Sequence, residues 1–153
     1  MAKNANGFEC PDGATADVVI YKEGLILLVK RKRDPYKDYW AFPGGFAEPY
    51  EKMMACCVRE TSEETGFNIA RNIDPRPIWV MNEHHDPRGW IVSVTYRAVF
   101  EIGENIPVLR AGDDADECRW VPMVDIVEGN VPMAFKHLEI VKWNVGIIKG
   151  LPF

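Results

Sequence analysis

Cysteine is scarce in this chain, and its few cysteines are not spaced for a metal site. There are four: Cys10 and Cys118 stand alone, and Cys56 and Cys57 are adjacent without a CxxC spacing. This arrangement matches neither a zinc site nor a disulfide framework. We therefore expect four reduced thiols.

Long apolar runs and an excess of positive charge are also absent. No stretch approaches the roughly 18 uninterrupted apolar residues of a membrane span, and the N-terminal segment lacks an apolar core of signal-peptide length. We therefore expect a cytoplasmic protein without a membrane partner. The net charge of −5 and the pI of about 5.2 argue against a general nucleic-acid binder. A small phosphorylated ligand stays compatible, because metal ions or arginines can meet its charge locally.

No repeat, low-complexity tract or linker divides the chain, so we expect a single domain over residues 1–153. Its patterns predict strands at 15–21, 25–29, 40–42, 76–81, 90–100 and 117–121, a loop at 103–114, and helices at 49–65 and 134–149. Segment 25–29 is apolar throughout, which is typical of a strand covered on both faces. Segment 90–100 alternates, which predicts one buried face. This mixture favours an α/β (α+β) fold with helices packed on a mixed sheet.

The segment RETSEETG, residues 59–66, concentrates negative charge at the end of the first predicted helix. At about 100° per residue, Glu60, Glu63 and Glu64 share one face. Such like charges destabilise a helix by a few tenths of a kcal/mol. A solvated acidic stripe is the ordinary interpretation. A divalent-cation site is the alternative, because Mg²⁺ and Mn²⁺ prefer hard oxygen ligands.

The wider spacing favours the second interpretation. Fixed residues recur as G-x5-E-x7-R-E-x2-E-E-x-G followed by an apolar residue, at Gly45, Glu51, Arg59, Glu60, Glu63, Glu64, Gly66 and Phe67. This resembles the Nudix box, G-x5-E-x7-R-E-u-x-E-E-x-G-u with u apolar, except that Thr61 occupies the middle apolar position. The order of strands around the box is also similar to the Nudix fold, which implies an α/β/α sandwich with a mixed β-sheet.

The resemblance implies hydrolysis of a nucleoside diphosphate linked to another group. Glu60, Glu63 and Glu64 would bind catalytic Mg²⁺ or Mn²⁺, with a carbonyl of the Gly44–Gly45 loop as a further ligand. Metal ions there would neutralise charge on phosphoryl oxygens and activate water. Arg59 would act beside these acids and pair with Glu51, and the box would depend structurally on Gly45, Glu51 and Gly66.

Two further segments, DPRGWIVSVTY at 86–96 and AGDDADECRWVP at 111–122, look like the ADP-ribose pyrophosphatase branch of the family. By this resemblance Arg88, Asp86 and Asp114 (beside Asp113) would bind substrate. Arg31, at the end of the second strand, would steer the diphosphate because a guanidinium suits phosphate oxygens. The alternatives are an ordinary turn at 86–89, a solvated acidic loop and a solvated charge run.

Histidines and aromatic residues carry weaker signals. His84 and His85 are either solvated or touch the ligand. We expect His137 on a helix surface and Cys56 as a small space-filling residue on the glutamate side of its helix. Three aromatic residues are either core or stacked on adenine, namely Trp40, Phe42 and Trp90.

Together these patterns predict a metal-dependent pyrophosphatase that converts ADP-ribose or a nucleoside diphosphate sugar to a nucleoside monophosphate and a sugar phosphate. Two other functions stay open: a nucleoside triphosphate pyrophosphatase, and a sensor that binds an ADP-ribose-type ligand without catalysis. By analogy with relatives, the resemblance also implies a homodimer.

Overall fold

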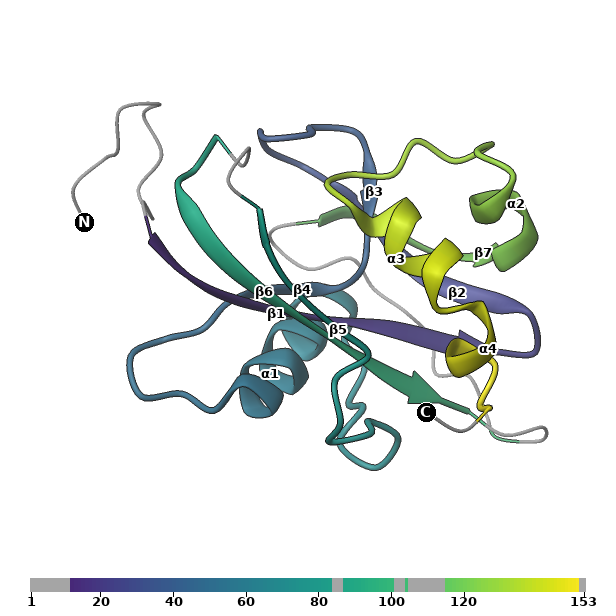
Figure 1. Cartoon of the computed structure of the whole chain (residues 1–153), viewed down its shortest axis with the longest axis horizontal. Helices are drawn as coiled ribbons and strands as arrows, with labels where there is room; N and C mark the ends of the chain where they lie inside the picture. The colour runs from purple at the N-terminus through teal and green to yellow at the C-terminus, as the bar shows by residue number, and fades with distance from the viewer. Residues whose placement is uncertain (1–11, 84–86, 101–103, 105–114, 152–153) are drawn as a thin grey trace.

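The computed structural model describes residues 12–83, 87–100, 104 and 115–151. Figure 1 shows a twisted sheet with helix α1 on one side and helices α2, α3 and α4 on the other. Seven strands form this sheet, namely β1 (Asp12–Lys22), β2 (Leu25–Arg31), β3 (Trp40–Ala41), β4 (Gly44–Phe46), β5 (Trp79–Glu83), β6 (Trp90–Val99) and β7 (Ala115–Pro122). In the described part of the chain, no helix is long and apolar enough to cross a membrane.

The sheet is mixed, as predicted. Strand β1 runs parallel to β6 and antiparallel to β2 and β4. Its other edge changes partner along its length: residues 15–17 pair with β4, whereas Tyr21 and Lys22 pair with β2. Strand β2 pairs further with β3 and β7. The exchange of partners places the short strand β4 in the middle of the sheet, beside β1.

Two hydrophobic clusters cover the two faces. Under α1 (Met53–Thr65) the core includes Ala16, Val18 and Ile20 of β1. On the opposite face, Val19 of β1 packs in the cluster formed with α2 (Met123–Val127), α3 (His137–Trp143) and α4 (Val145–Ile148). Strand β2 is buried continuously from Ile26 to Val29. This confirms the prediction of a strand covered on both faces.

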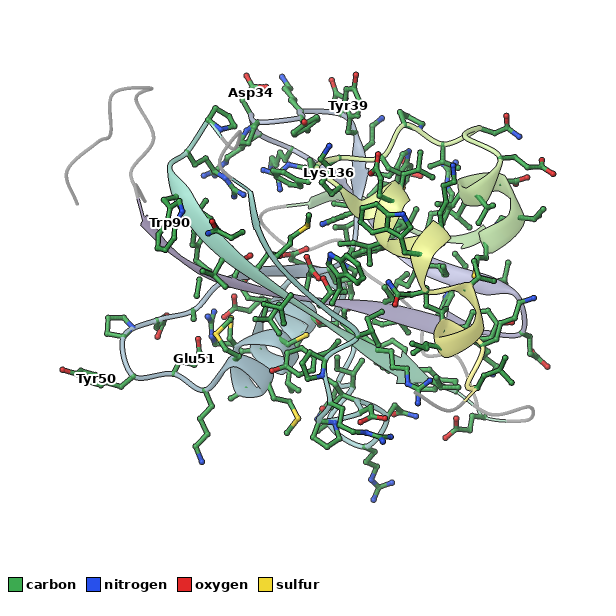
Figure 2. The ribbon with its side chains drawn as sticks, in the orientation of Figure 1. Asp34, Tyr39, Tyr50, Glu51, Trp90 and Lys136 are labelled. Atoms are coloured by element: carbon green, nitrogen blue, oxygen red, sulfur yellow. The ribbon has the colours of Figure 1, made fainter. Side chains whose placement is uncertain are left out.

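The first predicted helix begins later than expected, at Met53 rather than near Pro49. Tyr50 adopts a left-handed backbone conformation with φ 67°, and Figure 2 shows its side chain projecting away from the protein. The backbone amide of Glu48 donates to a carboxylate oxygen of Glu51, which closes a turn before the helix. The helix ends as predicted, because Gly66 takes a left-handed conformation and its amide donates to Ser62 O.

The prediction of one continuous helix at 134–149 is wrong. Segment 134–149 forms two short helices, α3 and α4, separated at Asn144. Asn144 has φ −125° and ψ 20°, and its buried side-chain amide donates to Ile140 O at 2.8 Å. A side-chain bond to the backbone competes with the helical pattern at this residue.

Two strand predictions also need correction. Strand β5 begins at Trp79 instead of residue 76, because Asp74 accepts a bond from the Arg76 amide and turns the chain there. Strand β6 is not buried on one face only: Tyr96 and Ala98 face one core, while Thr95 and Arg97 on the other face are also buried. The sheet is covered on both sides by this point, so the alternation does not mark a solvated face.

Candidate active site

Two adjacent glycines bring the box loop against strand β1. Gly44 pairs with Asp17 and Gly45 with Ala16. A Cβ on Gly44 would lie 2.3 Å from Ala16 O and 2.6 Å from Asp17 Cα. A Cβ on Gly45 would instead lie 2.5 Å from the carboxyl carbon of Glu60. The first glycine therefore permits strand packing, and the second leaves space for a glutamate of α1.

Arg59 joins the loop to the helix. Its Nε and Nη2 donate to the two carboxylate oxygens of Glu51 at 2.7 and 2.9 Å, and Nη2 also donates to Phe46 O at 3.1 Å. The predicted ion pair between Arg59 and Glu51 is therefore present. The guanidinium is the main cause that lowers the pKa of Glu51 to about 2 and, reciprocally, the carboxylate raises the pKa of Arg59.

The three box glutamates occupy different surroundings. Glu60 bonds Nη1 of Arg59 at 3.0 Å, and Glu63 bonds the same nitrogen at 3.2 Å with its side chain 58% exposed. Glu64 is buried. Glu60 and Glu64 line one cavity together with the Gly44–Gly45 loop. Among the described residues, no three His, Cys, Asp or Glu side chains form a group that could hold a metal ion. The convergence of all three glutamates on a cation stays a prediction.

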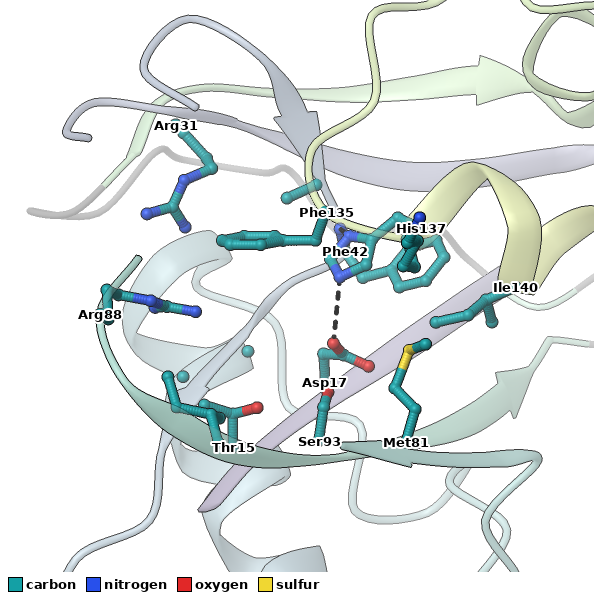
Figure 3. A pocket seen from close by; sticks show the side chains of 15 residues that line it. Thr15, Asp17, Arg31, Phe42, Met81, Arg88, Ser93, Phe135, His137 and Ile140 are labelled. Atoms are coloured by element: carbon teal, nitrogen blue, oxygen red, sulfur yellow. Dashed lines mark hydrogen bonds and ion pairs between the residues drawn. The ribbon is translucent and has the colours of Figure 1, made fainter. Parts of the chain in front are cut away.

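Two predicted arginines face this cavity, which has about 1160 Å³ of empty space including open solvent. Figure 3 shows Arg31 and Arg88 on one side of the cleft with Phe135 between them. The guanidinium carbons of Arg31 and Arg88 lie 5.0 and 4.9 Å from the centre of the Phe135 ring. Arg31 also donates from Nε to Pro35 O at 2.7 Å. Both side chains are therefore held at the cavity wall by ring and backbone contacts.

The cavity continues inward to a second, more apolar end. Arg31, Arg88, Phe42 and the two glycines line both parts, so the parts form one cleft. The inner end adds apolar and polar side chains that the sequence did not single out, namely Thr15, Asp17, Met81, Ser93 and Ile140. The lone carboxylate within the apolar segment of β1 was the signal that could have marked Asp17.

His137 is not on a helix surface, contrary to the expectation. It is buried, its ring stacks on Phe42 with centroids 4.1 Å apart, and its Nε2 lies 3.2 Å from Asp17 Oδ2. Phe42 is both a core residue and part of the cleft wall. Trp90 is 59% exposed, and Figure 2 shows it where β6 begins.

Of the described cysteines, Cys56 and Cys57 are buried and Cys118 is partly buried. Cys56, Cys57 and Cys118 are free thiols. Burial is the main cause that raises the pKa of Cys56 and of Cys118 to about 11, and it raises the pKa of Cys57 as well. Cys56 Sγ donates to Gly45 O at 3.5 Å. A protonated thiol in this position supports the loop and is a poor ligand for a hard cation.

Several predicted residues cannot be placed. Cys10, His84–His85, Asp86 and Asp113–Asp114, with most of the loop at 103–114, lie outside the described residues. Their predicted roles stay predictions.

The residues present fit a hard divalent cation. Glu60 and Glu64 supply carboxylate oxygens at one cavity wall, the loop beside them carries backbone carbonyls, and the missing Cβ of Gly45 gives the Glu60 carboxylate its space. Oxygen donors of this kind suit Mg²⁺ or Mn²⁺. Glu63 bonds Arg59 in this geometry. Its role in metal binding stays a prediction.

Comparisons with known proteins show the family of this chain. Residues 11–143 match the NUDIX domain. The chain is 37% identical over 127 residues to an ADP-ribose pyrophosphatase of Methanocaldococcus jannaschii, covering 82% of this chain and 69% of that protein. It is 31% identical over 134 residues to an ADPR-responsive transcriptional repressor of Acinetobacter baylyi, covering 84% of this chain and 51% of the repressor.

A solved structure shows the same fold. A bifunctional NMN adenylyltransferase/ADP ribose pyrophosphatase from Francisella tularensis, complexed with AMP and a Mn ion, superposes with a TM-score of 0.76 at 28% identity. The match covers 90% of this chain and 42% of that one, so the chain spans less than half of that bifunctional protein. The domain match, the box and the shared fold together place this chain in the Nudix family, as a domain of the pyrophosphohydrolase type.

Proposed function

We propose that this protein is a metal-dependent pyrophosphatase that hydrolyses ADP-ribose, or a related nucleoside diphosphate sugar, to a nucleoside monophosphate and a sugar phosphate. The observation that carries the proposal is one cleft that Glu60 and Glu64 line together with Arg31 and Arg88. The likeness to the Methanocaldococcus ADP-ribose pyrophosphatase supports the choice of substrate.

Each group in the cleft has a separate task in this proposal. Arg31 and Arg88 bind the non-bridging phosphate oxygens, because a guanidinium offers planar, paired donors. Glu60 and Glu64, with a carbonyl of the glycine loop, hold Mg²⁺ or Mn²⁺. The cation supplies charge neutralisation on the diphosphate. A carboxylate at this wall orients the attacking water and accepts its proton.

A substrate panel tests the proposal directly. Nucleotide release is measured from ADP-ribose, ADP-glucose and each dNTP with Mg²⁺, with Mn²⁺ and after chelation. We expect turnover of the diphosphate sugars, loss of turnover with chelator, and recovery on adding either cation. Preferential turnover of dNTPs would replace the proposal with the triphosphate pyrophosphatase alternative.

Variants of the two cavity glutamates test the site. Glu60→Gln and Glu64→Gln keep the side-chain shape and remove one charge, so we expect kcat to fall by about 10²-fold or more. Glu128→Gln, which changes an exposed carboxylate at the end of α2, is the matched control and should keep full activity. Full metal-dependent turnover in either cavity variant would contradict the roles assigned to these acids.

A ligand sensor is the second candidate, favoured by the likeness to the ADPR-responsive repressor. Binding of ADP-ribose by calorimetry, without product formation under either cation, would select this function. The intact box weighs against it, because Glu60, Glu64 and the Arg59–Glu51 pair are all present in the structure. A homodimer remains part of the proposal by analogy, and sedimentation equilibrium of the purified chain measures it.

A further inference from the structure

The inner end of the cleft contains a buried carboxylate whose hydrogen bonding is only half satisfied. Asp17 is 6% exposed and lines the cavity. Its Oδ2 lies 3.2 Å from His137 Nε2, whereas Oδ1 has no hydrogen-bond partner among the described residues. A buried acceptor without a partner lowers stability, so a native protein retains few of them without a use.

The hydrogen bonds of His137 fix which atom of Asp17 is left for a ligand. The backbone amide of Phe42 donates to Nδ1 of His137 at 3.1 Å, so Nδ1 carries no proton. The proton of the neutral ring therefore sits on Nε2 and points at Oδ2 of Asp17. Stacking on Phe42, with the rings 8° from parallel, holds the imidazole in this orientation. Oδ2 is occupied by this donor, and Oδ1 is the remaining acceptor.

The position of Asp17 connects this acceptor to the reaction centre. Asp17 pairs with Gly44 across β1 and β4, one residue from the glycine that packs against Glu60. Figure 3 shows Asp17 between Arg31 and Arg88 on one side and Met81 and Ile140 on the other. A diphosphate held by the arginines would therefore extend one of its substituents toward Asp17.

The charge distribution determines what that substituent can be. A buried carboxylate repels a phosphate group and attracts a hydrogen-bond donor. The neighbouring walls supply apolar surface from Met81 and Ile140 and hydroxyls from Thr15 and Ser93, and Lys136 also lines this end. At Asp17 itself the inner end therefore suits a group that has an apolar face and at least one N–H or O–H.

We propose that Asp17, oriented by His137, is a specificity-determining residue: its Oδ1 accepts a hydrogen bond from an amino or hydroxyl group on the nucleoside or sugar part of the substrate. This rests on the proposed function and deepens it. Asp17 therefore favours substrates that place their phosphates beside Arg31 and Arg88 and away from its own carboxylate.

The test compares the wild-type chain with Asp17→Asn, using ADP-ribose and IDP-ribose. The variant's amide oxygen accepts from His137 Nε2, so its amide NH₂ faces the cleft and a donor replaces an acceptor. We expect KM for ADP-ribose to rise about tenfold or more with kcat changed much less. If the adenine amino group is the donor, the preference inverts, because hypoxanthine has a carbonyl oxygen at that position. If a hydroxyl is the donor, KM rises equally for both substrates.

Two measurements separate a recognition role from loss of structure. Thermal unfolding shows whether Asp17→Asn is folded. Asp74→Asn is the matched control. It also removes the charge of a paired carboxylate, whose side chain is 17% exposed, but Asp74 does not line the cleft. It should lower stability and leave KM for both substrates unchanged.

Calorimetric binding of ADP-ribose to both chains distinguishes the possible failures. An unchanged KM and unchanged affinity in folded Asp17→Asn would overturn the role of Asp17 and leave the pyrophosphatase proposal standing. If the wild-type chain releases no product but binding still weakens in Asp17→Asn, the pyrophosphatase proposal would be overturned. The role of Asp17 in ligand recognition would then stand. A wild-type chain that binds neither ADP-ribose nor IDP-ribose would overturn both.

Discussion

Gly44 and Gly45 are neighbours, yet a methyl group on each would meet a different kind of obstacle. At Gly44 the obstacle is the backbone of β1, with Ala16 O at 2.3 Å. At Gly45 it is the end of the flexible Glu60 side chain, at 2.5 Å from Cδ. A side chain can rotate away, whereas a paired strand cannot move without losing its hydrogen bonds.

Alanine at the two positions should therefore separate stability from activity. We expect Gly44→Ala to lose about 1–3 kcal/mol or more of unfolding free energy, since strand β4 must shift. Gly45→Ala should stay close to the wild type in stability and lose most of its turnover, because the Glu60 carboxylate is displaced. Urea denaturation and initial rates measure the two effects. Equal losses of stability in both variants would contradict this distinction.

Asp17 and His137 show a different property of single residues. Their types alone gave no reason to connect them, and His137 was expected on a helix surface. Packing against Phe42 buried the imidazole and directed it to the carboxylate of β1. Residue type predicted the chemistry of the box, but it did not predict this pair.

Helix α1 and the turn before it form one unit through the Arg59–Glu51 pair. Glu51 accepts two bonds from the guanidinium and one from the Glu48 amide. These bonds favour the charged carboxylate, which lowers the pKa of Glu51 from 4.5 to about 2 in the folded chain. The stabilisation is therefore complete above pH 4.5 and is lost as the pH falls towards 2.

Glu51→Gln should remove this pH dependence. We expect the variant to be less stable than the wild type at pH 7, with the two chains converging as the pH approaches 2. The reason is that glutamine cannot titrate and cannot pair with the arginine charge. Unfolding free energies from urea titrations between pH 2 and pH 7 provide the measurement. Parallel curves over this range would show that Glu51 does not contribute through its charge.

The elements differ in how far local pattern determined them. The end of α1 was predicted correctly because Gly66 acts on its own turn. Its start was displaced because the Glu48–Glu51 turn occupies the residues before Met53. The division between α3 and α4 depends on a bond from the Asn144 side chain to Ile140 O, and apolar spacing contains no information about it.

A buried arginine connects strand β6 to helix α4 and to the turn at Asp74. Arg97 of β6 is 9% exposed and bonds Asp74, the carbonyl of Ile147 in α4 and Leu151 O. Arg76 lies closer to Asp74 and is the main cause that lowers the pKa of Asp74 to about 2. Its side chain is 66% exposed, so solvent screens that pair.

The two arginines should therefore differ in their effect on stability. We expect Arg97→Met to lower the unfolding free energy by about 1–3 kcal/mol, because Asp74 and two partly buried carbonyls lose their donor. Arg76→Met should change it far less, because solvent screens the exposed pair. Thermal and urea unfolding compare the two, and hydrogen exchange of α4 locates the change. Similar losses in both variants would contradict the dominance of the buried arginine.

The sequence by itself determined the box, the acidic face of α1, the mixed sheet and the family, because these follow from short, regular spacings along the chain. Tertiary structure alone decided that Glu60 and Glu63 both pair with Arg59, and that Glu60 and Glu64 line the cavity. It also decided that Phe42 and His137, 95 positions apart, meet beside Asp17. Contacts between distant segments depend on how the sheet and helices pack, and no local period in the sequence specifies that packing.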